Sequence, residues 1–233
     1  MPIVFVSRRG RALRFLPAFL LVIACGAAAQ EAGRLNELLS VCASCHGPDG
    51  VALGEEIPSL GGQNEAYLHG ALTDFKEGKR PSAIMRGMTR DLDDADIRAL
   101  ARHFAAKPYV RKPQAVAGNT AARGREVYER LCQICHLDQG RATTYAEYPL
   151  LAGQSLPYMQ KQMALILGQR RSVEVTKRGM LDLLSPQQID DAMHFFASQQ
   201  VSPDQVTGGL TTTEKRTRRR RFRTEPLANE ADG

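Results

Sequence analysis

The chain of 233 residues lacks several patterns that define common protein classes. No run of about 20 apolar residues is present, the length that a membrane-spanning helix needs. No segment alternates apolar and polar side chains as a half-buried strand does. The Gly-x-Gly-x-x-Gly fingerprint, a phosphate loop, a Ser-His-Asp set and a paired-carboxylate signature are also missing. These absences exclude a dinucleotide-binding domain and the commonest hydrolase sites, and they favour an all-α fold.

The net charge is +6, and the excess of positive charge lies at the two ends of the chain. Residues 30–202 contain 20 basic and 20 acidic side chains, so the folded part is neutral and no nucleic-acid binding is expected. The tail, residues 202–233, contains the run Lys215-Arg216-Thr217-Arg218-Arg219-Arg220-Arg221. Its composition predicts disorder. The tail is either simply solvated or makes contact with an anionic membrane surface or an acidic partner.

The N-terminus has the features of a secretory signal. Residues 1–14 contain four arginines and no acid, residues 15–24 are apolar, and Ala27-Ala28-Ala29 follows as a small-residue cleavage site. Residues 1–29 are therefore predicted to be a signal peptide, and the mature protein is expected in the periplasm. Cys25 ends a sequence similar to a lipoprotein cleavage box, so lipid anchoring there is the alternative.

Two copies of one motif are the strongest chemical signal. Cys42-Ala43-Ser44-Cys45-His46 and Cys132-Gln133-Ile134-Cys135-His136 both match Cys-x-x-Cys-His, the spacing for covalent attachment of haem c. The pairs lie too far apart for a zinc ribbon, and neither has the strand-helix context of a thioredoxin motif. A disulfide within so short a loop would be strained. The sequence therefore predicts two covalently bound haem c groups.

An internal repeat surrounds the two motifs. Residues 57–63 match residues 148–154, Tyr67 matches Tyr158, and residues 86–88 match residues 178–180. The repeat predicts two domains, at residues 30–107 and 121–201. Residues 108–120 contain two prolines and a glycine and are expected to be a linker.

Each unit has the apolar spacing of amphipathic helices. One amphipathic helix is expected before each motif, and another at the end of each unit. Asp93 or Asp94 and Ser185-Pro186 are predicted to begin the two closing helices. The faces are Leu35, Leu38, Leu39 and Cys42; Val127, Tyr128, Leu131 and Cys132; Ile97, Leu100, Ala101 and Phe104; and Ile189, Ala192, Met193 and Phe196.

With these motifs, residues 31–201 resemble class I c-type cytochromes of the dihaem, two-domain kind. Two groups fit: the c-four type of periplasmic electron carrier, and the cytochrome subunit of flavocytochrome c sulfide dehydrogenase. Residues 146–154 and 195–200 look somewhat closer to the second group. The resemblance implies two tandem cytochrome c domains, each folded around one covalent haem. It also implies redox protein partners such as an oxidase, a reductase or a flavoprotein subunit.

The resemblance also implies axial ligands to the iron. His46 and His136 would be proximal ligands, and the carbonyls of Pro58 and Pro149 would accept a hydrogen bond from their rings. Met85, twelve residues before Ile97, stands where these families place the distal methionine. Met88 is its nearby competitor.

The second unit departs from this pattern. The position equivalent to Met85 is Lys177, while Met180 aligns with Met88. Three possibilities stay open: Met180 ligates, Lys177 ligates as a neutral amine, or the sixth position is open.

Electron transfer by the two haems is the first functional hypothesis, with no catalytic residue. A subunit role beside a separate flavoprotein is the second, and catalysis on a small ligand at the second haem is the third. The remaining histidines, His69, His103 and His194, are expected at the surface or at the edge of the core.

Overall fold

The computed structural model describes residues 16–112 and 114–201, with the backbone alone for 16–29 and 31. Within these residues the chain forms helices and turns without a strand, which confirms the all-α prediction. The predicted tail, the first half of the predicted signal and the Cys25 side chain lie outside this description. The helices are α1 Leu16–His46, α2 Glu65–Glu77, α3 Ala83–Thr89, α4 Asp94–Ala105, α5 Gly118–Arg130, η1 Cys132–Ile134, α6 Leu137–Gly140, α7 Leu156–Leu167, α8 Val175–Asp182 and α9 Pro186–Ser198.

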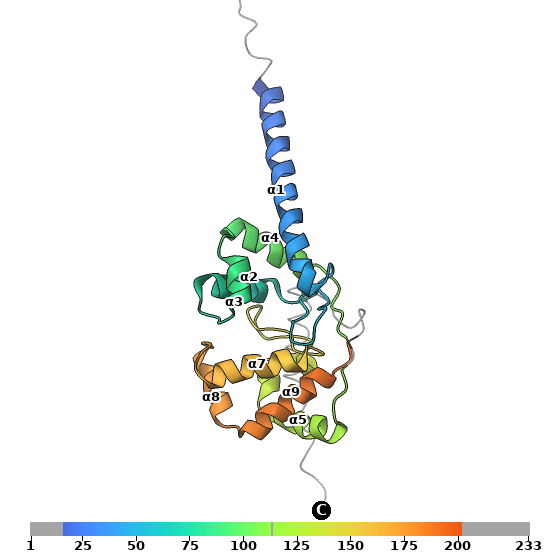
Figure 1. Cartoon of the computed structure of the whole chain (residues 1–233). Coiled ribbons are helices and arrows are strands. Elements are labelled where there is room, and N and C mark those ends of the chain that lie inside the picture. Colours follow the sequence, from blue (N-terminus) through green and yellow to red (C-terminus); the bar gives the residue numbers. More distant parts are fainter. Residues whose placement is uncertain (1–15, 113, 202–233) are drawn as a thin grey trace, which may run out of the picture.

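The first half of the chain folds around α1, whose N-terminal part extends away from the other helices (Figure 1). Two small apolar clusters form its core. One contains Leu68, Ala101 and Phe104, and the other contains Leu92, Ile97 and Leu100. Leu39 and Cys42 pack against both clusters but remain only half-buried. The apolar face predicted before the first motif is therefore the face that α1 turns toward the core.

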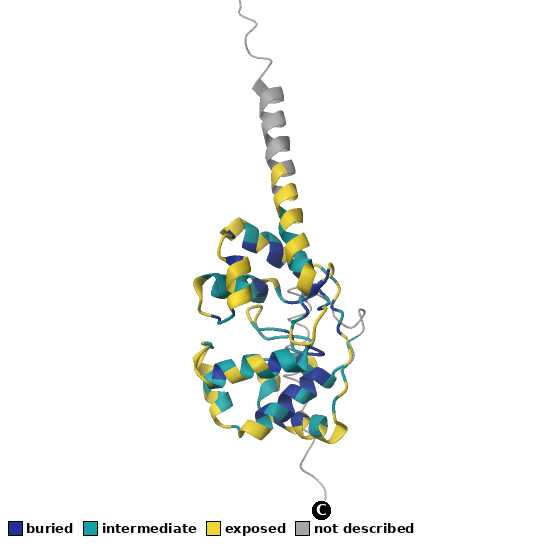
Figure 2. Cartoon of the chain, viewed as in Figure 1, coloured by how far each residue is buried: buried dark blue, intermediate teal, exposed yellow. Residues whose placement is uncertain are grey.

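The second half has one larger core between α5, α7 and α9. Val127, Tyr128, Phe195 and Phe196 belong to it, and the buried residues of α9 stand out in Figure 2. Gly124 of α5 lies so close to α9 that an added Cβ would come within 1.9 Å of the Asp191 carbonyl oxygen. A glycine is required where two helix backbones approach this closely.

Both closing helices begin as predicted. Asp93 caps α4, and its side chain accepts a hydrogen bond from the backbone N–H of Asp96. Ser185 caps α9 in the same way, with Pro186 in the first turn. Both helices begin with a capping box. In each, the side chain of the capping residue accepts from the backbone N–H of the third helical residue, whose side chain accepts from the backbone N–H of the cap. The helix before the second motif ends at Arg130, whereas α1 continues through the whole of the first motif. Leu131 and Cys132 therefore lie beyond the helix that was predicted to include them.

Two residues of the segment between α4 and α5 are buried against the rest of the protein, although others in it are exposed. Tyr109 is 2% exposed and donates a hydrogen bond from Oη to the Ala152 carbonyl, at 2.8 Å. Arg111 is also buried, with its guanidinium 3.6 Å from the centre of the Tyr109 ring. Its Nη1 donates to the carbonyl of Gly61 at 3.0 Å. These contacts hold the connecting segment against both halves.

The two halves stack with their matching loops between them (Figure 1). Hydrogen bonds join residues 59–64 of one loop to residues 143–154 of the other. The backbone N–H of Tyr67 donates to the carbonyl of Ala146 at 3.2 Å. In the described part of the chain, no helix has the length and apolar character needed to cross a membrane.

Candidate haem sites

The first motif lies at the C-terminal end of α1. Cys42 is half-buried against the apolar clusters, Cys45 is exposed, and His46 is the last residue of the helix. A helix brings residues three and four apart to neighbouring positions on its surface. The two thiols and the imidazole therefore lie close together beside the core of the first half.

His46 is fixed by one hydrogen bond. Its Nδ1 lies 2.9 Å from the carbonyl oxygen of Pro58, as the family resemblance implied. A carbonyl can only accept, so the proton must be on Nδ1 and the lone pair on Nε2. Burial lowers the pKa of His46, which favours this neutral ring. A neutral imidazole with a free Nε2 is the form that binds a metal.

The second motif has the same hydrogen bond to a proline carbonyl, but it begins in a short 3-10 turn rather than in a long helix. Cys132 lies in the turn η1, and Nδ1 of His136 lies 3.1 Å from the carbonyl oxygen of Pro149. The ring of Phe196 meets that of His136 edge to face, with centroids 6.0 Å apart. Burial and the charge of Lys177 lower the pKa of His136 to about 3. This ring is therefore neutral as well.

The motif cysteines are free thiols in the structure. Burial raises the pKa of Cys42, and it raises the pKa of Cys132 to about 11. No group of three or more His, Cys, Asp or Glu side chains among the described residues could hold a metal ion.

Met85 and Met88 both lie on α3, one turn apart. Ser82 caps this helix, and its Oγ accepts a hydrogen bond from the Met85 N–H at 3.2 Å. Met85 is half-buried, whereas Met88 is 53% exposed. Met85 is therefore the less exposed of the two candidate ligands.

Lys177 and Met180 occupy the equivalent helix, α8, and both are half-buried. The Lys177 charge acts electrostatically on Cys132, Cys135 and His136. Burial and the nearby positive charge of Arg171 lower the pKa of Lys177 to about 8. The lysine at the Met85-equivalent position is therefore half-buried, and its pKa is lower than that of an ordinary lysine.

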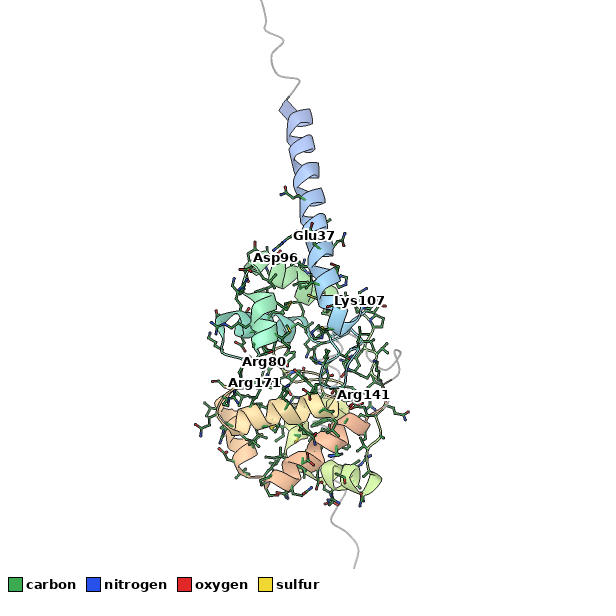
Figure 3. All side chains as sticks on the ribbon, viewed as in Figure 1. Glu37, Arg80, Asp96, Lys107, Arg141 and Arg171 are labelled. Atoms are coloured by element: carbon green, nitrogen blue, oxygen red, sulfur yellow. The ribbon has the colours of Figure 1, made fainter. Side chains whose placement is uncertain are left out.

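A cluster of cations and phenols lies where the two halves meet (Figure 3). Arg80 donates to the hydroxyls of Tyr67 and Tyr158 and to Oε1 of Gln162. Arg171 donates to the same Gln162 oxygen, at 2.7 Å. The tyrosines match in the sequence repeat, but their convergence on one arginine had no signal in the sequence.

The other histidines lie outside these sites. His69 bonds to Asp94 at the surface, 3.1 Å away, and His103 is half-buried beside Phe104. His194 has Nε2 3.4 Å from Asp190 on the same helix. These positions confirm the surface or core-edge prediction.

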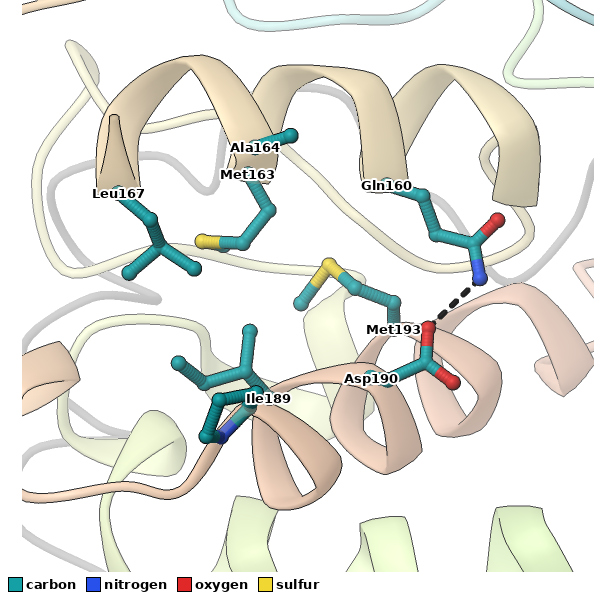
Figure 4. A pocket seen from close by; sticks show the side chains of 8 residues that line it. Gln160, Met163, Ala164, Leu167, Ile189, Asp190 and Met193 are labelled. Carbon is teal, nitrogen blue, oxygen red and sulfur yellow. Dashed lines mark hydrogen bonds between the residues drawn. The ribbon is translucent and has the colours of Figure 1, made fainter. Parts of the chain in front are cut away.

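A small apolar hollow lies between α7 and α9 (Figure 4). Met163, Leu167, Ile189 and Met193 line it, and Gln160 donates to Asp190 at its edge, at 2.6 Å. None of the motif residues lines this hollow.

The residues present fit covalent haem in both halves. Each motif combines two free thiols with a neutral histidine whose Nε2 has no competing hydrogen bond among the described residues. Apolar residues around the first motif, such as Leu38 and Leu39, are only half-buried, as expected of side chains that a porphyrin would cover. Arg80 is 3% exposed and has no carboxylate within ion-pair distance in the described structure. Such a buried cation suits a cofactor with carboxylate groups.

Known proteins agree with this fit. A family model for subunit III of cbb3-type cytochrome c oxidase matches residues 28–103. Cytochrome c4 of Azotobacter vinelandii is 37% identical over 151 residues, which are 58% of this chain and 72% of that protein. The structure of reduced cytochrome c4 from Pseudomonas stutzeri aligns with a TM-score of 0.64 at 25% identity, over 72% of this chain and 98% of that one. The cytochrome subunit of sulfide dehydrogenase from Chlorobaculum tepidum is 39% identical over only 70 residues, 30% of this chain and 63% of that protein.

The fold and both motifs define a dihaem class I cytochrome c built from two tandem cytochrome c domains. The match to the Azotobacter protein is long enough to settle the family. This chain belongs to the cytochrome c4 family, with two covalently bound haem c groups attached at the paired cysteines. It is an electron carrier rather than an enzyme, and its partners are redox proteins.

Proposed function

We propose that the protein passes single electrons through two haems with different axial ligands. His46 and Met85 hold the iron of the first haem, and His136 and Lys177 hold that of the second. Each bound haem supplies a one-electron Fe(III)/Fe(II) couple, and the protein sets its potential through the axial ligands and their surroundings. The two histidine-to-proline-carbonyl hydrogen bonds are the observation that supports this proposal most directly.

Lys177 rather than Met180 is proposed for the second haem because it stands at the position that matches Met85 in the repeat and is half-buried there on α8. An amine is a harder ligand than a thioether, so it favours Fe(III) and lowers the reduction potential. The second haem would then have the lower potential and would pass electrons toward the first. Met180, one turn further along α8, is the alternative ligand.

We further propose that the protein works in the periplasm, where its predicted signal would send it. Relatives named thiosulfate dehydrogenase electron acceptor, such as that of Thiomonas intermedia at 33% identity, suggest a dehydrogenase as donor. An oxidase or reductase would then be the acceptor. The basic tail would provide contact with an anionic membrane surface, a role that removal of residues 203–233 would test by vesicle binding.

Low-temperature EPR of the oxidised, haem-loaded protein tests the ligand sets. The expected result is two low-spin signals, one of His/Met character and one of His/amine character. Two His/Met signals would place Met180 on the second iron. A high-spin signal of about one haem equivalent would mean an open sixth position and would contradict the assignment of Lys177.

A further inference from the structure

The peptide group that accepts a hydrogen bond from His46 also forms a hydrogen bond with the other domain. The carbonyl of Pro58 accepts the hydrogen bond from His46 Nδ1. The N–H of the same peptide group belongs to Ser59, and it donates to Oε1 of Gln154 at 3.0 Å. Gln154 also donates from Nε2 to the carbonyl of Ser59 at 2.9 Å. One side chain of the second domain thus forms two hydrogen bonds with the loop that orients the first histidine.

The arrangement is reciprocal. The carbonyl of Pro149 accepts from His136, and the N–H of the same peptide, at Leu150, donates to Oε1 of Gln63 at 2.7 Å. Nε2 of Gln63 donates in return to the carbonyl of Leu150, at 3.0 Å. Each domain therefore contributes a glutamine to the histidine-holding peptide of the other.

Both glutamines are rigidly placed and shielded from water. Each is 4% exposed. Each follows a glycine with positive φ, 68° at Gly62 and 64° at Gly153, a backbone conformation that glycine adopts without strain. The N–H of each glycine donates to the last helix of its own domain, at Phe104 and Phe196. Each glutamine is thus anchored in one domain while its amide reaches the other.

We propose that Gln63 and Gln154 are positioning residues that act in trans on the two haems. Hydrogen bonds in a chain polarise one another, most strongly where water is excluded. A peptide whose N–H donates to glutamine has a more electron-rich carbonyl, which draws the histidine Nδ1–H more strongly. The imidazole becomes more basic and favours Fe(III). Gln154 thus lowers the potential of the first haem, and Gln63 lowers that of the second.

This inference rests on the proposed axial roles of His46 and His136. It gives the domain interface a function beyond holding the domains together. A change in how the domains dock would alter the hydrogen bonds to both histidine-holding peptides and therefore the ligand field at each iron. Two iron sites that share no ligand are then coupled through two peptide groups and two side-chain amides.

The test is a spectroelectrochemical titration of the full-length, haem-loaded protein with Gln154→Leu and Gln63→Leu substitutions. Each midpoint is assigned through NMR contacts between haem methyl groups and the motif residues. Gln154→Leu should shift the reduction equilibrium of the first haem toward Fe(II) about threefold, or about 28 mV at 59 mV per tenfold change. The second haem should move less. Gln63→Leu should produce the mirror result.

Asn64→Ala is the matched control. Asn64 bonds across the same interface to Thr143 and the Tyr148 carbonyl, but not to the Pro58–Ser59 or Pro149–Leu150 peptide groups that hold the histidines. It should leave both midpoints unchanged. In the reduced protein, the Nδ1–H resonance of His46 should move upfield in Gln154→Leu, and that of His136 in Gln63→Leu.

Gln154→Glu separates polarisation from simple loss of packing, because a carboxylate still accepts from the Ser59 N–H. Its first-haem midpoint should lie at or below that of the unmodified protein. Equal shifts at both haems, a larger shift in the glutamine's own domain, or a glutamate variant that behaves like the leucine one would overturn the inference. EPR of the unmodified protein distinguishes failure of this inference from failure of the proposed function. Absence of histidine-ligated signals in the unmodified protein would contradict the proposed function itself.

Discussion

Arg80 of the first domain donates a hydrogen bond to Tyr158 of the second, and the guanidinium that joins them is buried. The same group contacts Tyr67 and lies 4.6 Å from the centre of the Phe75 ring. Taking a cation out of water is costly unless its surroundings compensate for it. Here the compensation from described residues consists of two phenols, one amide oxygen and the face of the Phe75 ring. No carboxylate among the described residues pairs with this cation, which lies where the two domains meet.

Replacing Arg80 with methionine should lower the reduction potentials of both haems. A nearby cation stabilises the reduced state, and a charge about 15 Å away contributes about 1 kcal/mol at an effective dielectric constant of about 20. The expected decrease is therefore about 40 mV for each haem, measured by spectroelectrochemical titration. Arg102→Met, at an exposed arginine of the first domain, is the control and should have little effect. Unchanged potentials in Arg80→Met would mean that another group already neutralises the cation.

Replacing Lys177 with methionine should raise the potential of the second haem alone. A thioether favours Fe(II) more than an amine does, and the change is expected to be on the order of 100 mV. The His/amine EPR signal should become a second His/Met signal. Lys112→Met, at an exposed lysine, should change neither observable. The ligand assignment fails if Met180→Ala, rather than Lys177→Met, alters the second signal.

Local and repeated features of this protein were predictable from the sequence. Three of the four periodic apolar faces and the caps at Asp93 and Ser185 occur as expected, whereas the face before the second motif ends at Arg130. The bonds from both histidines to Pro58 and Pro149 occur as the family resemblance implied. They depend on residues close in the chain or on matching halves of the repeat.

Contacts between the halves were not predictable, because no local pattern encodes them. Tyr109 and Arg111 lie in a segment whose prolines and glycine indicate a linker, yet both are buried by long-range contacts. Gln63 and Gln154 were visible as repeat matches, but the peptide that each one bonds belongs to the opposite domain. Which residues a repeat brings together depends on how its two copies dock.

Gly124→Ala should destabilise the second domain. The added Cβ would lie 1.9 Å from the Asp191 carbonyl oxygen and 2.8 Å from Cβ of Phe195, so α5 and α9 would have to separate. Overpacking of this kind costs about 1–3 kcal/mol, and a clash with backbone places the effect near 3 kcal/mol. Denaturant unfolding of the haem-loaded protein measures it. Gly118→Ala in the same helix meets no atom within 4 Å and should change the stability by less than about 0.5 kcal/mol. Similar effects of both substitutions would contradict the close helix contact.

Asp191 should make stability depend on acid pH through its pair with Arg123. The carboxylate is 3% exposed, and Nε and Nη2 of Arg123 each lie 2.8 Å from one of its oxygens. The hydrogen bonds from Arg123 hold the pKa of Asp191 below its ordinary value. The folded state therefore binds this proton less readily than the unfolded state, whose pKa is about 3.9. The stabilisation is fully present above that value and is lost as the pH falls through the folded pKa.

Asp191→Asn keeps the shape of the side chain but removes its charge and its titration. At pH 7 it should lower the free energy of unfolding by about 1–3 kcal/mol, as expected for hydrogen bonds to a charged group. As the pH falls below about 4, the difference should shrink, because the unfolded aspartate takes up its proton first and the native one only below its lower pKa. Urea unfolding at pH 7, 5 and 3 measures this difference directly. A difference that stays constant down to pH 3 would show that shape rather than charge holds α5 against α9 at this point.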